Sequence, residues 1–405
     1  MQKHKVIISH PEKQHSYQTA FALQEGELLC KYFTSIWYNP KIFLYKLVNV
    51  LPSVLRKVVT KELKKRYFEQ IDSKLVVQYP WFDLIGVLLR RIFKSTKVSE
   101  VLIHWVNRNF DKWVAGKLKK MDFDLFIGYE GTSLESFKAC KNKNIKCILE
   151  LAAPHFTQQE KPRLEKSILY NEADFLQKKN SIKKTELEIA DLILVPSFYS
   201  MSSLINAGIS ESKIRHCPYG VDLQQFDQKK YYRKGGKFIL LFVGAIIPRK
   251  GLKYLLESYS QLTLSDSELF LVGSMPAGGE IFNQYKGLFK HVPFLLHEEL
   301  VSYYQNADVF VFPSLDDAFP LAVLEAMASG TPVIISENTG TKDVVRNGID
   351  GFIIPVRNVD ALKEKILFFY NNREKVEEMG RNARTQAEKY SWEKYRESIR
   401  IQVLR

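Results

Sequence analysis

The sequence predicts an α/β protein made of two doubly wound parallel-sheet domains. Short apolar segments alternate along the chain with amphipathic segments, which is the pattern of strands and crossover helices in a parallel sheet. This alternation runs twice, on either side of a polar stretch that contains a glycine pair at 235–236. The 405 residues also exceed what one hydrophobic core ordinarily holds.

The first series occupies residues 1–228 and is expected to form the N-terminal domain. Its expected strands are residues 6–9, 125–128, 147–151 and 191–197, and its expected helices are 18–32 and 133–143. The apolar stretch at 6–8 is too short for a signal peptide, and no run approaches the roughly 20 apolar residues that span a bilayer. This half has no Gly-x-Gly-x-x-Gly fingerprint, which disfavours a dinucleotide enzyme.

Residues 41–120 interrupt this series with a basic insertion that is expected to be helical. They hold 18 Lys and Arg residues against 6 Asp and Glu residues, an excess of 12 in a chain whose net charge is +14. Apolar residues at helical spacing lie between these cations, and Pro52 breaks the first stretch. One interpretation is a surface for an anionic membrane; the other is a stripe packed on the domain beneath a solvated basic face. No nucleic-acid recognition motif is present.

A linker at 229–236 leads to the second series, which is expected to form a domain over residues 237–390. Its expected strands are 238–244, 269–273, 309–312 and 332–335, and its expected helices are 252–261 and two that begin near residues 299 and 320. The same spacing of strands and helices as in the first half predicts a second parallel sheet.

The segment 308–335 carries the most information about chemistry. It predicts a strand, a loop, a helix that begins near Pro320, a turn and another strand. The free N–H groups and dipole of that helix face the carboxyl edge of the sheet, where ligands of doubly wound domains bind. Glu325 lies in the first turns of the helix. From spacing alone, its carboxylate fits either a ligand for ribose or sugar hydroxyls or a residue that only stabilises the helix dipole.

These residues resemble the signature of the retaining glycosyltransferases of family four. Asp317 is followed by seven residues, by Glu325 and by the run Ala-Met-Ala-Ser-Gly-Thr-Pro-Val, where the family has Glu, seven residues, Glu and Ala-Met-Ala-x-Gly-x-Pro-Val. Four further segments are similar to family motifs in the same order: 216–222, 242–251, 292–308 and 340–355. The match is strong over residues 215–360 and weak before them.

The resemblance implies the GT-B fold, in which two Rossmann-like domains face each other across a cleft. It also implies that the last segment, 391–405, forms a helix that crosses back onto the N-terminal domain. The implied activity is a retaining, hexosyl-type transfer from a nucleoside-diphosphate sugar to a glycan, a lipid-linked acceptor or another hydroxyl acceptor. UDP- and GDP-sugars both fit, and UDP is favoured.

The resemblance assigns the donor site to the second domain. Gly244, Arg249 and Lys250 fall where the family binds the donor phosphates, and preorganised cations stabilise the charge of a departing diphosphate. Asp317 falls near the donor sugar, although Asp316 is an alternative, and Glu325 falls where the ribose is held. Backbone N–H groups that meet the sugar and phosphate are expected from Phe319, Leu321 and Ala322, because Pro320 has none. Many members carry an Arg where this chain has Ala245.

The first domain is expected to supply the acceptor side. His155 follows the strand at 147–151 and matches a family His close to the reacting carbon, with Glu150 as the second candidate. His10, Gln14 and His15 lie in the loop after the first strand, where many members have a glycine pair.

No metal or other cofactor is expected. Asp122-Phe-Asp124 looks like an Asp-x-Asp metal motif, but it precedes its strand, whereas ligand loops of parallel sheets follow their strands. Arg249, Lys250 and the helix N-terminus are expected to do what a divalent ion would otherwise do.

Two other functions remain open from the sequence. One is a sugar-nucleotide epimerase or hydrolase on the same fold, and the other is a non-catalytic nucleotide-sugar-binding protein, which Ala245 and Asp317 keep open. The four cysteines show no metal spacing and fit a reducing cytosol. The expected location is therefore cytoplasmic, with attachment to the inner face of a membrane through residues 41–120.

Overall fold

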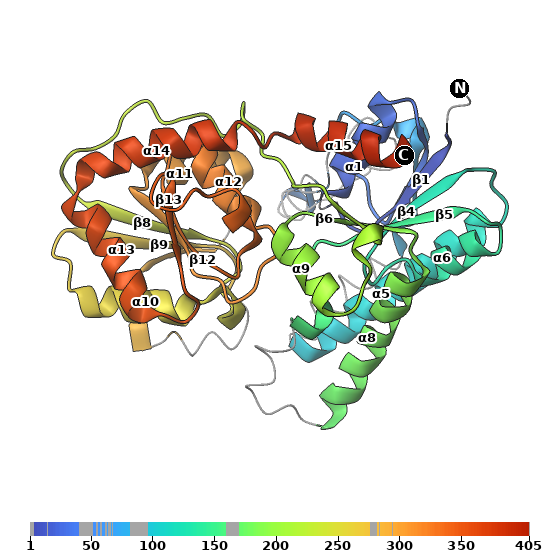
Figure 1. Cartoon of the computed structure of the whole chain (residues 1–405), viewed down its shortest axis with the longest axis horizontal. Helices are drawn as coiled ribbons and strands as arrows, with labels where there is room; N and C mark the ends of the chain where they lie inside the picture. Colours follow the sequence, from blue (N-terminus) through green and yellow to red (C-terminus); the bar gives the residue numbers. More distant parts are fainter. Residues whose placement is uncertain are drawn as a thin grey trace.

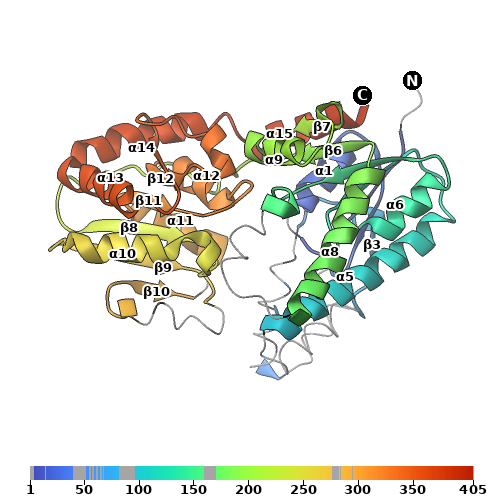
Figure 2. The same ribbon diagram turned by 60° about the horizontal axis from the view of Figure 1, so that its bottom comes forward.

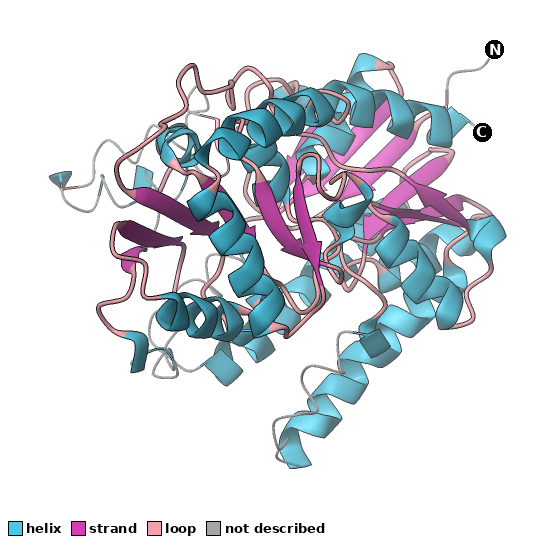
Figure 3. Ribbon diagram, turned by 60° about the vertical axis from the view of Figure 1, so that its left-hand side comes forward, coloured by secondary structure: helices cyan, strands magenta, loops and turns pink. Residues whose placement is uncertain are grey.

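The computed structural model describes residues 4–13, 15–39, 68–81, 96–158, 170–275, 284–293 and 295–404, with single positions between 52 and 66 and at 282. Within these residues, two parallel sheets form two lobes that lie side by side (Figure 1). Helices enclose the strands of both sheets (Figure 3). The α/β class predicted from the alternating pattern is confirmed.

The first sheet has the order β3-β2-β1-β4-β5-β6-β7. Its strands are β1 (Val6–Ser9), β2 (Leu29–Thr34), β3 (Val76–Gln78), β4 (Leu125–Tyr129), β5 (Lys146–Glu150), β6 (Leu192–Val195) and β7 (Ile214–His216). Its helices are α1 (Ser16–Glu25), α5 (Thr96–Leu118), α6 (Leu134–Lys141), α8 (Tyr170–Ile189) and α9 (Phe198–Asn206). The strands are short and almost wholly apolar because helices cover them on both faces.

The second sheet has the order β10-β9-β8-β11-β12-β13. Its strands are β8 (Phe238–Val243), β9 (Ser267–Val272), β10 (Lys290–Val292), β11 (Val309–Phe312), β12 (Val333–Ser336) and β13 (Gly351–Ile354). Its helices are α10 (Leu252–Leu262), α11 (His297–Asn306), α12 (Leu321–Ala328), α13 (Val359–Asn371) and α14 (Arg373–Ala387). The short helices η4 (Pro248–Lys250) and η6 (Gly340–Asp343) follow β8 and β12.

The predicted helix at 18–32 is wrong in its second half. α1 ends at Glu25, Gly26 caps it, and Glu27 takes a left-handed φ of 55° that turns the chain. The following apolar residues then pair in parallel with β1 as β2. Tyr32 and Phe33 on this strand are buried, so tertiary burial outweighs the local helical periodicity.

The interpretation of residues 41–120 as a helical insertion is also wrong in part. Residues 76–78 form β3, the edge strand of the first sheet, which pairs with β2. The second half of α5 packs on the same sheet through the buried residues Phe110, Val114 and Leu118. α5 and α8 run side by side away from the sheet (Figure 2), and the rings of His104 and Phe175 are 5.5 Å apart. Residues 40–51 and 82–95 lie outside the described residues.

The C-terminal helix α15 (Trp392–Leu404) packs against α1 of the first domain (Figure 1). Arg396 and Arg400 both donate to Oε2 of Glu25, at 2.9 and 2.8 Å. The chain passes between the domains twice, after β7 and again before α15. Where these two segments meet, Val221 N–H donates to Tyr390 O at 3.0 Å. A Cβ on Gly220 would lie 2.2 Å from Ser391 C, so only glycine permits this close crossing.

The linker after this crossing is anchored by a buried lysine. Lys229 is 7% exposed, and its Nζ donates to Ala307 O at 2.7 Å and to Thr331 Oγ1 at 3.1 Å. The ring of Tyr232 lies 4.8 Å from the same nitrogen. Burial lowers the pKa of Lys229 from 10.5 to about 7, although the nearby Asp308 carboxylate opposes this shift.

We predict that this lysine makes the free energy of unfolding depend on pH. Between about pH 7 and 10 the unfolded chain keeps a proton on Lys229 that the folded chain has lost, so Lys229 stabilises the fold increasingly as pH rises. Thermal and urea unfolding should show the deficit of Lys229→Met relative to wild type growing by at least about 1 kcal/mol over this range. Lys253→Met, which removes an exposed lysine of α10, is the control. A deficit that shrinks with rising pH would contradict the assignment.

Candidate active site

The loops after β8 and β11 lie together at the carboxyl edge of the second sheet. Leu315 N–H donates to Arg249 O at 2.9 Å, which joins η4 to the loop after β11. Gly251, directly after η4, has a left-handed φ of 71°, and a Cβ on it would lie 1.8 Å from Pro313 O. A side chain at this position would therefore push the two loops apart. Carboxyl edges of parallel strands are where such sheets bind ligands.

Arg249 and Lys250 both contact the loop after β11. The Arg249 guanidinium donates through Nη1 to Asp316 O, and the Lys250 ammonium forms an ion pair with Asp317 Oδ2. The Lys250 and Asp317 side chains are 13% and 14% exposed, so water screens this pair weakly. The structure thus brings together three residues that the resemblance assigns to one donor site.

Gly244 lies at the end of β8, as expected for the loop that approaches phosphate. Its N–H, however, donates to Val272 O of the neighbouring strand at 2.9 Å. Gly244 has no side chain to keep a ligand away from the backbone. Its own N–H group, however, is already hydrogen-bonded within the sheet and is not available to a ligand.

Helix α12 begins beside these loops, with Pro320 as its N-cap and no side-chain hydrogen bond that caps it. Leu321 and Ala322 are its first two residues, so their N–H groups belong to the exposed end of the helix dipole. Glu325 is 9% exposed and accepts a hydrogen bond from Tyr304 Oη of α11 at 2.7 Å. Its carboxylate is thus oriented by a neighbouring helix.

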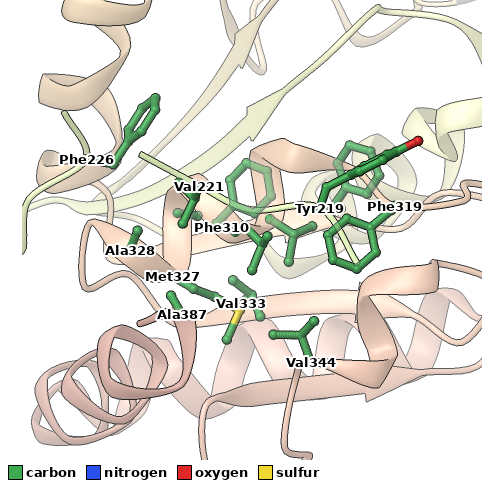
Figure 4. Close-up of a cluster of buried hydrophobic side chains, with 14 of the residues drawn as sticks. Tyr219, Val221, Phe226, Phe310, Phe319, Met327, Ala328, Val333, Val344 and Ala387 are labelled. Atoms are coloured by element: carbon green, nitrogen blue, oxygen red, sulfur yellow. The ribbon is translucent and has the colours of Figure 1, made fainter. Parts of the chain in front are cut away.

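Phe319 joins the two domains from the same loop. Its ring makes an edge contact with Tyr219, from the interdomain segment, at 5.7 Å between centroids. Figure 4 shows both rings beside the buried core that contains Phe310 and Met327.

Tyr199 of α9 connects the first domain to this loop, and the sequence analysis missed it. Its hydroxyl donates to Asp316 Oδ1 at 2.9 Å, whereas Asp316 Oδ2 is buried with no hydrogen-bond partner among the described residues. Burial raises the pKa of Asp316, and the Tyr199 hydrogen bond opposes the shift. The sequence feature that could have indicated Tyr199 is its position, since it closely follows the end of β6 and the helix cap Ser197.

A second contact crosses between the domains at the same helix. Phe198 N–H, at the N-terminus of α9, donates to Asp343 Oδ2 of η6 at 2.6 Å. Asp343 is therefore an N-terminal cap supplied by the opposite domain. Asp316 and Asp343 hold the start of α9 from two loops of the second sheet.

His155 lies in the loop after β5 and is linked to the same helix. Its backbone N–H donates to Ser203 Oγ at 2.9 Å, and its Nδ1 lies 2.8 Å from Thr157 Oγ1. Gln158, three residues later, contacts the Tyr199 hydroxyl at 3.5 Å. Burial, followed by the charge of Lys183, lowers the pKa of His155, which favours a neutral imidazole. The loop of His155 and the loop of Asp316 thus meet at one tyrosine.

Glu150 and His15 belong to a buried network. His15 Nε2 lies 2.8 Å from Glu150 Oε1, and Tyr395 Oη of α15 donates to the same oxygen at 2.7 Å. Burial by itself raises the pKa of Glu150, but the adjacent His15 ring and the Tyr395 hydroxyl outweigh it and lower the pKa. His10 lines a pocket that Glu150 also lines, and Gln14 lies outside the described residues.

The Asp122-Phe-Asp124 pair faces Lys5 at the start of the first sheet. Lys5 N–H donates to Asp124 Oδ2 at 2.7 Å, and Lys5 Nζ lies 3.0 Å from Asp122 Oδ2. Among the residues that the structure describes, no group of three or more His, Cys, Asp or Glu side chains is arranged to hold a metal ion.

Comparison with known proteins identifies the second domain. Residues 224–386 match the family Glycosyl transferases group 1. The chain is 30% identical over 174 residues to the UDP-Gal:alpha-D-GlcNAc-diphosphoundecaprenol alpha-1,3-galactosyltransferase of Escherichia coli, covering 38% of this chain and 44% of that one. The second domain is therefore similar to the group 1 glycosyltransferases over these residues, which confirms the resemblance found in the sequence. The matched part of the chain spans about half the length of these curated relatives.

Solved structures establish the fold over the whole chain. The sucrose-phosphate synthase of Thermosynechococcus elongatus superimposes with a TM-score of 0.66 and 19% identity, covering 99% of this chain and 98% of that chain. Anabaena HepE, solved in complex with UDP, superimposes with a TM-score of 0.65 and 12% identity, covering 98% and 99% of the two chains. The fold is GT-B.

We predict that Glu325 contributes to nucleotide affinity apart from its structural bond to Tyr304. Glu325→Gln keeps the volume but removes the charge, so charge-assisted bonds to a ribose should weaken by about 1.5–3 kcal/mol in titrations with UDP. Tyr304→Phe removes the hydrogen bond between Tyr304 and Glu325 but leaves the carboxylate in place, so it is the matched control. Equal losses of UDP affinity in the two variants would leave Glu325 a structural role only.

Proposed function

We propose that the chain transfers a hexosyl group, with retention of configuration, from a nucleoside-diphosphate sugar to a hydroxyl acceptor. The observation that carries this proposal is the gathering of Arg249, Lys250 and the start of α12 around Asp316 and Asp317. Two cations and a helix N-terminus that has no side-chain cap suit a leaving group that departs as a diphosphate. The pocket in the first domain favours a separate acceptor over an epimerase or hydrolase.

The ion pair suggests how the donor enters. A diphosphate that approaches Lys250 competes with Asp317 for the ammonium group and frees that carboxylate for a hydroxyl of the donor sugar. The bond from the anomeric carbon to the phosphate oxygen then breaks, and the acceptor oxygen bonds to the same face. The acceptor proton passes to the departing diphosphate, so no covalent nucleophile on the protein is needed.

UDP is the nucleotide that we propose for the donor. Anabaena HepE is solved with UDP, and the name of the E. coli relative specifies UDP-Gal. No metal ion or other cofactor takes part in the proposed reaction, because Arg249 and Lys250 supply the positive charge that a divalent ion otherwise brings.

We further propose a lipid-linked acceptor and attachment to the cytoplasmic face of an anionic membrane. The E. coli relative is named for an acceptor on diphosphoundecaprenol. Residues 41–120 carry an excess of 12 positive charges, and the exposed Val98, Val101 and Trp105 recur at helical spacing on α5. Among the described residues, no helix is both long and apolar enough to cross a membrane.

The proposed function predicts that Arg249 and Lys250 are needed for turnover. Replacing both with Ala should lower kcat at least about 100-fold, since each cation acts where charge develops. The assay is UDP release from a panel of UDP-sugars with a panel of hydroxyl acceptors. Lys253→Ala, on the exposed face of the next helix, should retain wild-type rates. EDTA should leave the wild-type rate unchanged, and a strict need for added Mg²⁺ or Mn²⁺ would exclude the metal-free site.

The membrane proposal predicts binding to anionic vesicles that weakens with salt. Each Lys or Arg near an anionic surface contributes about 1 kcal/mol, and salt screens it. Co-sedimentation with phosphatidylglycerol vesicles should therefore be strong at low salt and absent with phosphatidylcholine alone. If the chain stays in the supernatant with anionic vesicles at low salt, the membrane proposal fails and the transferase proposal stands.

A further inference from the structure

The first domain contains a pocket of about 350 Å³, within the roughly 300–1,000 Å³ that is typical of small-molecule sites. Its walls come from the loops after β1, β4 and β5 and from α5. These are the carboxyl ends of three adjacent parallel strands, the edge at which doubly wound sheets bind ligands. The pocket therefore has the position of a binding site, and it is separate from the donor loops of the second domain.

The pocket is acidic. Glu12, Glu130 and Glu150 line it, and none of the lining residues that the structure describes is Lys or Arg. His10, the one imidazole among the described lining residues, is neutral at physiological pH because burial lowers its pKa to about 4. Lys183, the cation that pairs with Glu130, is not among the described residues that line the pocket. A phosphate or carboxylate that entered would meet like charge.

Glu130 has an unfilled hydrogen-bonding position. Its side chain is 10% exposed, and Oε2 accepts from Lys183 Nζ at 2.7 Å. Its other oxygen, Oε1, is buried with no hydrogen-bond donor among the described residues. A buried carboxylate oxygen without a donor is unfavourable, so the site is completed by a group that donates a hydrogen bond. The neighbouring Tyr129 hydroxyl cannot serve, because it donates to Thr19 Oγ1 at 3.0 Å.

We propose that this pocket binds the acceptor as an uncharged sugar whose hydroxyl donates to Glu130, and that it rejects phosphorylated or carboxylated sugars. Ile103 of α5, which is 37% exposed, gives one apolar wall for the C–H face of the ring. The inference rests on the proposed transferase function, because it names the chemistry of that reaction's acceptor. A lipid-linked diphosphate would then lie outside the pocket, with only the terminal neutral sugar inside.

The test is saturation-transfer NMR titration of the full chain with UDP present, using methyl glycosides of common hexoses and the matching hexose 6-phosphates. At least one methyl glycoside should bind roughly tenfold more tightly than its phosphate. Glu130→Gln should lose about tenfold of that affinity. Glu188→Gln removes a carboxylate from the exposed face of α8, outside the pocket, and should bind as wild type does.

Ile103→Arg keeps the test decisive if Glu130→Gln does not fold. This variant adds a cation at a partly exposed position of the wall and should raise the affinity for hexose 6-phosphates about tenfold. Wild-type affinity for phosphates equal to or above that for methyl glycosides would overturn the inference, as would unchanged selectivity in both pocket variants. If no methyl glycoside binds while UDP still does, the acceptor assignment fails and the donor-based function survives.

Discussion

The ion pair between Lys250 and Asp317 is the interaction on which the proposed donor site depends. It joins the loop after β8 to the loop after β11, and Arg249 reinforces the junction through Asp316 O. Charges this buried are stable only with a partner, so the ammonium of Lys250 must keep a negative group beside it. In the free chain that group is Asp317, and a diphosphate is the ligand best suited to replace it. The chemistry of the site follows from this exchange of partners.

The same loop also fixes the relation between the two domains. Asp316 accepts from Tyr199 and Asp343 of η6 accepts from the N-terminus of α9, so the loops after β11 and β12 both contact the first domain directly. In the first domain, the Tyr395 hydroxyl of the crossing helix α15 donates to Glu150, which lines the acidic pocket. Hydrogen bonds thus join the loop of Asp316 to the first domain and helix α15 to the pocket wall, so we expect movement of one domain relative to the other to affect both proposed sites.

Patterns of contiguous residues predict much of the fold and several residues of the proposed donor site. The apolar run of β11 and the spacing of Asp317 and Glu325 are properties of contiguous residues, so the sequence alone predicts them. β2 and β3 were not predicted, because β2 continues the periodicity of α1 and β3 has only three residues at the sheet edge. The contacts of Tyr199 and Glu130 join residues distant along the chain, and no local pattern encodes them.

The central claim is that the loops after β8 and β11 bind a nucleoside diphosphate without a metal ion. Calorimetric titration of the wild-type chain, in buffer with EDTA, against UDP, GDP and their monophosphates tests it most directly. The account predicts that one diphosphate binds at least about tenfold more tightly than its monophosphate, because the second phosphate meets Lys250 and the start of α12. Equal affinity for diphosphate and monophosphate, or no binding of either diphosphate, would contradict it.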